Sequence, residues 1–370
     1  MNIDLRNLAT AGVRGLRPYQ PGKPTSELQR ELGLDEIVKL ASNENPSGPG
    51  RLALSAAREA LAEGARYPDG SGFTLKRKLA GRLGVAPECL TLGNGSSEVL
   101  EMLARAVLDA DHDAVYSSYA FAVYPLATRA VGARGVVAAS RGFGDDLDTM
   151  RGALGPRSRV VFIANPNNPT GTWLARDAIE AFLDAVPADL LVVIDEAYFE
   201  YPEVTGYASC IDLIERFPNL IVTRTFSKVY GLAGLRVGYG VSDPRIAELL
   251  NRVRQPFNVN AVALAAAEAA LDDTEHLSLS LEVNRTGLTQ LTTGLAALGL
   301  EYIPSVANFV TVRVPRPATE VYADLLRAGV IVRPMAGYGL PEHLRVTVGV
   351  ERENRRFLDA LGALLAPASA

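Results

Sequence analysis

The strongest constraint on the fold is an alternation of short β-branched runs with helix-length segments between about residues 85 and 240. The runs are Asp113–Tyr116, Val160–Ala164, Leu190–Ile194, Leu220–Thr223 and Val237–Val241. Strands that alternate with helices are joined by crossover connections, so the pattern predicts an α/β protein with a mostly parallel sheet flanked by helices. In such sheets, ligands bind beyond the carboxyl ends of the strands.

The pattern changes after about residue 245. A long Ala- and Leu-rich helical segment, Ala261–Leu271, precedes further helices and the apolar runs Asn308–Val314, Gly329–Arg333 and Leu344–Val348. A length of 370 residues is typical of two domains. We therefore expect a large domain over residues 41–249, and a smaller α+β domain made of residues 1–40 and 250–370.

Composition excludes several classes of protein. With 48% apolar and 21% charged residues the chain is not disordered, and a net charge of −5 argues against a dedicated nucleic-acid binder. Cys89 and Cys210 lie too far apart for a CxxC pair, and the three scattered histidines predict no metal site. The N-terminus lacks the apolar core of a signal peptide, and Glu268 interrupts the most apolar later stretch, so we expect a cytoplasmic protein that binds no membrane.

The segment TRTFSKVYGLAGLRVGYG contains the first candidate for chemistry. Lys228 is preceded by the hydroxyl residues Thr225 and Ser227, and Arg236 follows eight residues later. An arginine and hydroxyls suit a phosphate, and an amine beside a phosphate site is what a Schiff-base lysine requires with a phosphorylated aldehyde cofactor. An isolated Ser-Lys pair would more simply be a solvated turn.

Asp195 ends the apolar run LLVVID. A carboxylate that leaves a buried strand needs a cation or a strong donor, and a protonated pyridine nitrogen would serve. The alternative is a helix N-cap.

Two loops add further polar groups. The segment Asn165–Gly171 contains two prolines, so its backbone is rigid and would present the Asn168 amide at a strand end. The alternative is a loop without a functional role. The segment GNGSS, with Ser96 and Ser97, precedes a helical pattern and is a candidate anion site. The third glycine of GxGxxG and the pattern GxxxxGK[ST] are both absent, which argues against a dinucleotide enzyme and a P-loop NTPase.

These segments in this order resemble the fold-type I pyridoxal-phosphate (PLP) aminotransferases: NPNNPTG, then DEAY, then SK with an arginine eight residues later. More narrowly, the chain resembles the histidinol-phosphate aminotransferase group, over roughly residues 15–355. The matching segments are RPYQPGKP, LASNENPSGP, RYPDGSG, GNGSSE, YAFAVYP, GLAGLRVGYG, ANFVTVRV and LRVTVG.

The resemblance implies a set of cofactor contacts. Lys228 would bind the PLP aldehyde covalently and later move the substrate proton, Asp195 would pair with the pyridinium nitrogen, and Tyr198 and Asn168 would contact the phenolic oxygen. The implied phosphate contacts are Ser96, Ser97, Thr225, Ser227 and Arg236. Phe121 would stack on the cofactor ring, with Tyr119 as the alternative.

The resemblance also implies a homodimer, in which Tyr67 reaches the phosphate in the neighbouring subunit. Arg345 would clamp an anionic group of the amino donor, and Arg333 would bind the substrate phosphate. Tyr19 and Asn43 would line the same mouth.

The implied reaction is transamination between histidinol phosphate/imidazole acetol phosphate and glutamate/2-oxoglutarate, in histidine biosynthesis. The partners are thus a small amino donor and a 2-oxo acid. The nearest alternatives keep the cofactor: an aromatic amino-acid aminotransferase, or an enzyme like threonine-phosphate decarboxylase. A non-catalytic PLP-binding module of a transcription regulator would need a basic helix-turn-helix, for which the chain has no spare length.

Overall fold

The structure is a computed structural model that describes residues 4–16, 18 and 22–366. The large sheet in this part of the chain has seven strands. In spatial order they are β2 (Leu90–Gly93), β8 (Gly238–Ser242), β7 (Leu220–Thr225), β6 (Leu191–Asp195), β5 (Ser158–Ala164), β3 (Asp113–Ser117) and β4 (Arg134–Ala138). β8 runs antiparallel to both neighbours, and the other pairs are parallel. The prediction of a mostly parallel sheet is confirmed.

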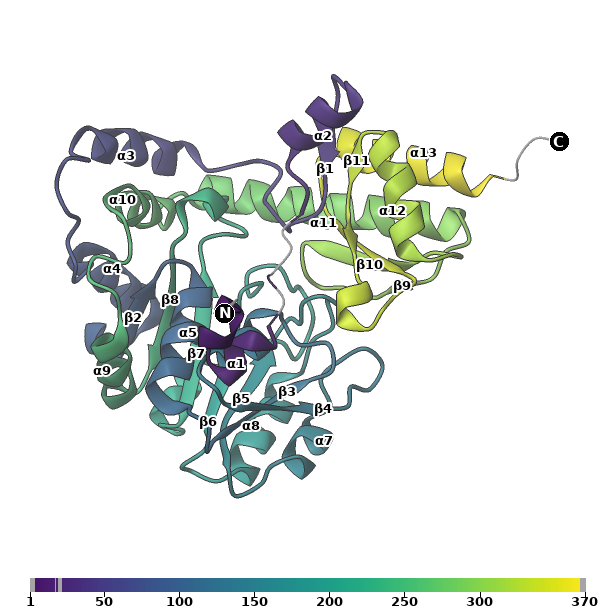
Figure 1. Cartoon of the computed structure of the whole chain (residues 1–370). Helices are drawn as coiled ribbons and strands as arrows, with labels where there is room; N and C mark the ends of the chain where they lie inside the picture. Colours follow the sequence, from purple (N-terminus) through teal and green to yellow (C-terminus); the bar gives the residue numbers. More distant parts are fainter. Residues whose placement is uncertain (1–3, 17, 19–21, 367–370) are drawn as a thin grey trace.

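Both faces of this sheet are buried, as its apolar strands predict. Along β5, Val160 and Phe162 join one apolar cluster, whereas Val161 and Ile163 join the cluster on the opposite face. The first cluster includes side chains of α5 (Ser96–Val107), α6 (Val123–Ala130) and α9 (Pro244–Val253). The second includes side chains of α4 (Phe73–Leu83), α8 (Arg176–Ala185) and α10 (Ala261–Ala270). The sheet is thus the middle layer of three (Figure 1).

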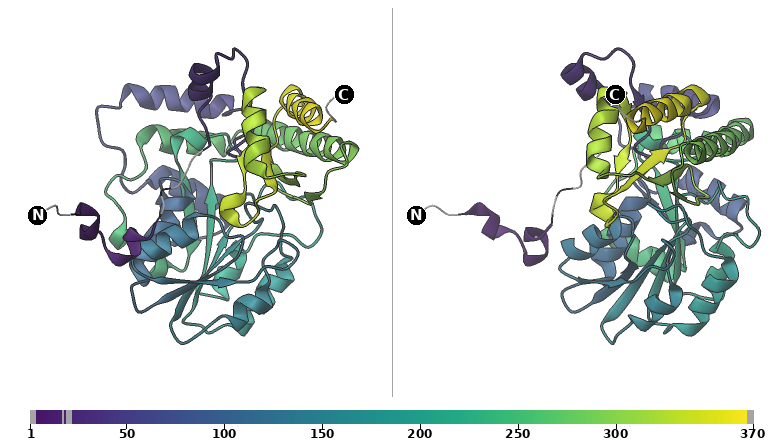
Figure 2. Two further views of the ribbon diagram at one scale, coloured as in Figure 1. Left: turned by 45° about the vertical axis from the view of Figure 1, so that its right-hand side comes forward. Right: turned by 90° about the vertical axis from the view of Figure 1, so that its right-hand side faces the viewer.

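A second unit is built on a four-stranded antiparallel sheet. Its order is β12 (Arg333–Pro334), β13 (His343–Thr347), β10 (Phe309–Arg313) and β9 (Tyr302–Ile303). Helices α11 (Thr274–Ala297), α12 (Ala318–Arg327) and α13 (Glu351–Leu365) share its apolar core. Figure 2 shows this unit beside the carboxyl-end edge of the large sheet.

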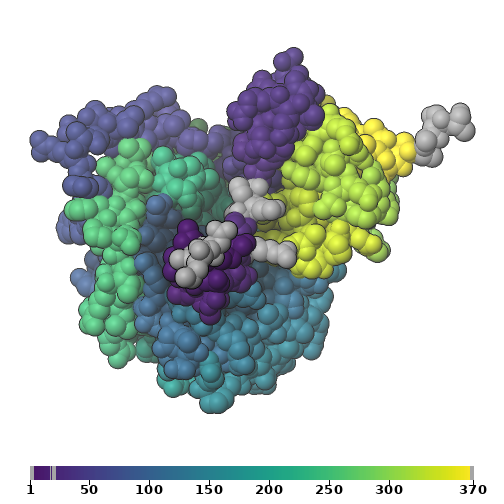
Figure 3. All heavy atoms as spheres, in the orientation of Figure 1, coloured from purple at the N-terminus to yellow at the C-terminus, as the bar shows by residue number. Residues whose placement is uncertain are grey.

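The N-terminal segment joins the second unit through a short parallel pairing of β1 (Val38–Lys39) with β11 (Val330–Ile331). Leu28 of α2 (Thr25–Leu32) packs with Ile331 in the same small cluster. The space-filling view shows α2 standing against the C-terminal part of the chain (Figure 3). The remaining helices are α1 (Ala11–Arg14), α3 (Arg51–Ala62) and α7 (Leu147–Gly152).

The division into domains at residues 40 and 250 stays a prediction. The pairing of β1 with β11 supports an N-terminal contribution to the small domain. The packing fits the boundary at residue 250 less well. Helix α10 lies after this boundary, yet it contributes Ala263, Ala266 and Ala267 to the core of the large sheet. We therefore propose that the small domain resumes near Thr274, where α11 begins.

Candidate active site

Most of the predicted site residues gather around one cavity of about 240 Å³, which we call the inner cavity. The predicted residues that line it are Asn43, Ser96, Ser97, Phe121, Asn168, Asp195, Tyr198, Thr225, Ser227, Lys228, Arg236 and Arg345. They come from the ends of β5, β6 and β7 and the segments that follow them, from the start of α5, from β13, from the segment after β1 and from the loop between β3 and α6. The cavity therefore lies at the carboxyl edge of the large sheet, where the fold brings strand ends together.

Lys228 enters this cavity from the loop after β7. Its Nζ donates to the carbonyl oxygen of Ser42 at 3.3 Å and lies 5.5 Å from the ring centre of Tyr198. Burial, followed by the nearby Arg345 cation, lowers the pKa of Lys228 to about 7. A substantial fraction of this amine is therefore uncharged at neutral pH, as a nucleophile or proton acceptor must be.

Asp195 stands at the end of β6 and is 3% exposed. Its Oδ2 accepts a hydrogen bond from the Tyr124 hydroxyl and its Oδ1 accepts one from the Thr223 hydroxyl, both at 3.0 Å. Burial raises the pKa of Asp195 to about 6. Since both side-chain partners are neutral, a cationic group in the cavity would stabilise the ionised carboxylate.

The loop after β5 is held by its own asparagines. Asn165 exchanges hydrogen bonds with the backbone of Leu174, at 2.9 and 3.1 Å. Asn167 donates to the carbonyl oxygen of Tyr119 at 3.2 Å and to the hydroxyl of Thr170 at 2.9 Å. These bonds fix the backbone on both sides of Asn168 and so present its amide at the cavity wall, as the sequence predicts.

Tyr198 and Asn43 form a buried pair. The Asn43 amide nitrogen donates to the Tyr198 hydroxyl oxygen at 2.9 Å, and Asn43 itself adopts a left-handed φ of 54°. Thr347 holds that conformation: it accepts from the Asn43 backbone nitrogen at 2.9 Å and donates to Asn43 Oδ1 at 3.2 Å. Burial raises the pKa of Tyr198 to about 12, so the phenol keeps its proton at neutral pH. The role of Asn43 as a substrate contact stays a prediction, and its side chain is already bonded to Tyr198 and Thr347.

The opposite wall has the donors expected of an anion site. Arg236 Nη1 donates to Ser227 Oγ at 3.2 Å, and a Cβ on Gly95 would stand 2.4 Å from its Nη2. A Cβ on Gly238 would stand 2.4 Å from the backbone nitrogen of Ser96, the first residue of α5. The two glycines thus let a guanidinium and a helix N-terminus approach closely, and both favour a bound phosphate.

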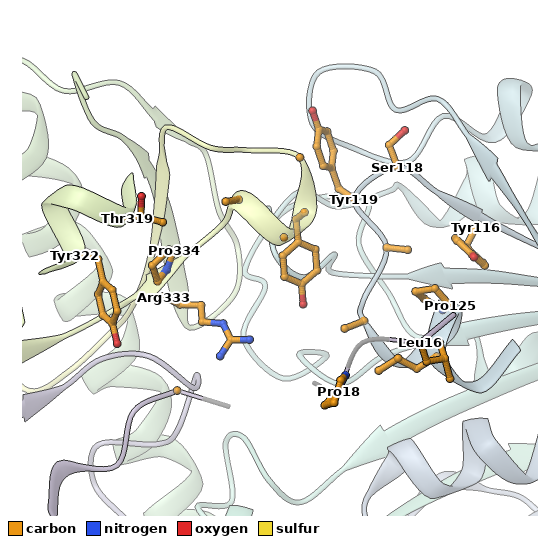
Figure 4. A pocket seen from close by; sticks show the side chains of 18 of the residues that line it. Leu16, Pro18, Tyr116, Ser118, Tyr119, Pro125, Thr319, Tyr322, Arg333 and Pro334 are labelled. Atoms are coloured by element: carbon orange, nitrogen blue, oxygen red, sulfur yellow. The ribbon is translucent and has the colours of Figure 1, made fainter. Parts of the chain in front are cut away.

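Arg333 does not line the inner cavity. It lies on β12 and extends into a wider groove of about 1340 Å³, which we call the outer groove (Figure 4). The outer groove lies between the second unit, with Tyr322, and the large unit, with Tyr119 and Pro125. Tyr338 lines both spaces and so connects them.

The predicted residues still to be placed are the two candidate stacking rings, Tyr67 and Tyr19. Phe121 lines the inner cavity whereas Tyr119 lines the outer groove, which supports Phe121 as the stacking ring. Tyr67 is 82% exposed, stacks on Phe257 at 4.6 Å and does not line the inner cavity of its own chain. Tyr19 lies outside the described residues.

The sequence reasoning missed several residues of this site. Tyr124 and Thr347 lie within the matching segments YAFAVYP and LRVTVG, and Thr223 ends an expected strand, but all three act through other side chains, and nothing in the sequence singles them out. Tyr338 carried a usable signal, because it stands between two glycines in the segment that joins the arginine-bearing strands.

Comparison with known proteins agrees with this geometry. A family model described as "Aminotransferase class I and II" matches residues 35–361. The chain is 57% identical over 358 residues to a protein named histidinol-phosphate aminotransferase 1 from Nitrosococcus oceani, which covers 97% of both chains. It is also 57% identical over 365 residues to histidinol-phosphate aminotransferase 2 from Pseudomonas aeruginosa, which covers 98% of this chain and 99% of that protein.

Among solved structures, the histidinol-phosphate aminotransferase from Sinorhizobium meliloti, in complex with pyridoxal-5'-phosphate, superposes with a TM-score of 0.86. It is 29% identical and covers 96% of this chain and 97% of that one. The predicted fold-type I architecture is therefore confirmed. With a family match over most of its length and relatives of this similarity, the chain belongs to the aminotransferase class I and II family.

Proposed function

We propose that this protein is a PLP-dependent aminotransferase that exchanges an amino group between histidinol phosphate/imidazole acetol phosphate and glutamate/2-oxoglutarate. The observation that carries the proposal is the placement of Lys228 and Asp195 on one cavity, whose wall also includes Arg345. Relatives named for this activity match nearly the whole chain, which extends the proposal from the cofactor to the substrate.

The residues of the inner cavity fit the cofactor. Asp195 is a buried carboxylate with neutral side-chain partners, and it suits a protonated ring nitrogen. Arg236, Ser227 and the N-terminus of α5 would hold the phosphate, with Ser97 and Thr225 beside them. When bound, PLP supplies the electron sink that stabilises negative charge on the substrate carbon.

Lys228 performs two tasks in this account. Its amine would hold the cofactor covalently between turnovers, and in turnover Nζ would take the proton from the amine-bearing carbon of the substrate and deliver it to the cofactor. A pKa near 7 suits both directions of transfer, because the amine can accept and release a proton at neutral pH. Tyr198 and Asn168, which line the inner cavity, would contact the phenolic oxygen of the cofactor.

Two arginines select the substrate. Arg345 is 6% exposed and faces the inner cavity, where its planar fork suits a carboxylate beside the reacting carbon. Arg333 lies in the outer groove and suits a phosphate at the far end of a longer substrate. We propose Asn43, which lines the inner cavity, for the same mouth.

We also propose an active homodimer, in which Tyr67 is contributed to the phosphate site of the partner subunit. Its support is the exposure of the Tyr67–Phe257 pair and the absence of Tyr67 from the cavity of its own chain.

The described residues include no helix that is long and apolar enough to cross a membrane. We place the protein in the cytoplasm, because both cysteines are unpaired, as in a reducing compartment.

A substrate panel tests the proposal. PLP-loaded protein is mixed separately with histidinol phosphate, glutamate, phenylalanine and threonine phosphate, and conversion of the cofactor to its pyridoxamine form is followed by absorbance. We expect fast conversion with histidinol phosphate and glutamate. Faster conversion with phenylalanine, or release of carbon dioxide from threonine phosphate, would contradict the assigned substrate and favour the corresponding alternative.

A further inference from the structure

The carboxylate of Asp195 receives one hydroxyl donor on each oxygen, from two different elements. Tyr124 of α6 donates to Oδ2 and Thr223 of β7 donates to Oδ1, each at 3.0 Å. Neither residue lines the inner cavity, so both act on Asp195 from behind the site.

The Tyr124 phenol has little freedom to move. Its side chain is 1% exposed and its ring stacks on Phe162, with centroids 4.9 Å apart and planes 8° apart. Its other ring neighbour is Phe121, which meets it edge-on at 5.7 Å and 86°. Close packing on these rings fixes the direction of the hydroxyl.

Thr223 is fixed by the sheet itself. It lies directly opposite Asp195 in the parallel register of β6 and β7, and it is 1% exposed. A β-branched side chain in a strand has restricted χ1 freedom, so its hydroxyl stays aimed at the neighbouring carboxylate.

We propose that Tyr124 and Thr223 are positioning residues that set the plane of the Asp195 carboxylate for the ring nitrogen of the cofactor. This inference rests on the proposed function of the inner cavity. A carboxylate turns readily about its terminal bond, and two fixed donors on its two oxygens stop that rotation. Hydrogen bonds to the ionised form also stabilise the charge that the ring nitrogen requires.

A purely structural role would give a different result. In that case each hydroxyl would only satisfy its own hydrogen-bonding requirement inside the protein. Removing the hydroxyl would then lower the free energy of unfolding without changing the affinity for the ring nitrogen. The experiment must therefore measure binding of the cofactor ring separately from folding and from formation of the covalent bond to Lys228.

Pyridoxamine 5'-phosphate is the suitable probe, because it has the ring and the phosphate but no aldehyde. Its dissociation constant is measured with cofactor-free wild type, Tyr124→Phe, Thr223→Val and the control Tyr239→Phe. Tyr239 is a buried tyrosine of the same sheet, 6% exposed, whose hydroxyl is hydrogen-bonded to Arg224 and which does not line the inner cavity. Each variant is repeated in an Asp195→Asn background to form a double-mutant cycle.

We expect Tyr124→Phe and Thr223→Val each to weaken binding about tenfold, the size of one hydrogen bond to a charged group. The control should bind like wild type, and the two losses should shrink to about twofold or less in the Asp195→Asn background. Binding equal to the control, or an undiminished loss without the Asp195 charge, would overturn the assignment. If Tyr124→Phe does not fold, Thr223→Val alone decides between these outcomes. Failure of wild type itself to bind the probe would instead overturn the proposed function, and the assignment with it.

Discussion

Arg345 Nη1 donates a hydrogen bond to Oδ1 of Asn168, and both side chains are buried. Because the guanidinium occupies the amide oxygen, the amide nitrogen of Asn168 is the group left to donate toward a ligand. A second donation, from Arg345 Nη2 to the carbonyl oxygen of Ala41 at 2.9 Å, ties the same arginine to the N-terminal segment. One side chain of β13 therefore ties the loop after β5 to the N-terminal segment at the wall of the inner cavity.

Arg345→Lys should raise KM for glutamate about tenfold or more, since lysine cannot reproduce a two-pronged contact with a carboxylate. Steady-state kinetics with glutamate as the varied substrate provide the measurement. Arg313→Lys is the matched control, because Arg313 lies on the neighbouring strand β10 and pairs with Glu342 at the surface. An unchanged KM in Arg345→Lys would remove the carboxylate role from this residue.

Arg333→Gln should lower kcat/KM for histidinol phosphate by about tenfold to a hundredfold, the range for loss of a charged hydrogen bond. The same variant should leave the half-reaction with glutamate nearly unchanged, because glutamate has no phosphate to reach the outer groove. Single-turnover rates with the two donors separate these effects. Equal losses on both donors would mean that Arg333 supports the fold of the site and does not bind the phosphate.

The Lys228 amine should titrate near neutrality. Its pKa is lowered to about 7 by burial and by the Arg345 cation, so its reactivity should rise with pH through about 7 and level off above it. The rate at which cofactor-free protein is labelled by an amine-reactive aldehyde followed by borohydride reports this titration, and Lys228→Ala gives the background. Arg345→Gln should move the midpoint upward, because it removes a positive charge. A midpoint near that of surface lysines would contradict the burial argument.

Asp195→Asn should stabilise the cofactor-free protein at pH 7.5 but not at pH 4. The pKa of Asp195 is raised from 3.8 to about 6, so the folded protein binds the proton more tightly than the unfolded chain. The free energy of unfolding therefore falls as pH rises from about 4 to 6, and stays lower above that window by on the order of 2–3 kcal/mol. Urea unfolding of both proteins at the two pH values measures the difference. Equal stability at pH 7.5 would show that the carboxylate is not strained by burial.

Complementation tests the contribution of Tyr67. Tyr67→Ala and Lys228→Ala chains are purified separately, then mixed and allowed to exchange subunits. If Tyr67 serves the partner's site, each mixed dimer contains one site with both residues intact, so activity should exceed the sum of the separate proteins. Activity that does not rise, in a mixture shown to exchange subunits, would place Tyr67 outside the neighbouring site.

Most of the large sheet can be predicted from the sequence, because its buried strands are the apolar runs that the sequence shows. Runs such as Leu220–Thr223 and Val160–Ala164 are apolar on both faces and lie in β7 and β5. Two strands of the seven-stranded sheet were missed: Leu90–Gly93 is short, and Arg134–Ala138 lies at the sheet edge, where exposed positions interrupt the apolar run. The two-residue strands β1 and β9 were missed as well.

The residues of the candidate site also fall into two groups: some can be predicted from local sequence, and others are brought together only by the tertiary fold. Residues that follow strand ends, such as Asp195 and Lys228, can be found from local sequence because the fold brings strand ends together. Contacts such as that of Asn43 with Tyr198 join residues 155 positions apart, and packing alone determines them. Arg333 and Arg345 are directly paired on β12 and β13, yet Arg333 lines the outer groove and Arg345 lines the inner cavity, a separation that no local sequence pattern indicates.

Under the proposed function, Lys228 moves the proton in amino transfer to and from histidinol phosphate. The most direct test mixes histidinol phosphate with PLP-loaded wild type and Lys228→Ala, and follows appearance of the pyridoxamine form in a single turnover. We expect rapid conversion in wild type and a rate at least about a hundredfold lower in the variant, since general acid–base catalysis supplies that factor or more. Conversion at a comparable rate in both proteins would show that Lys228 does not move this proton.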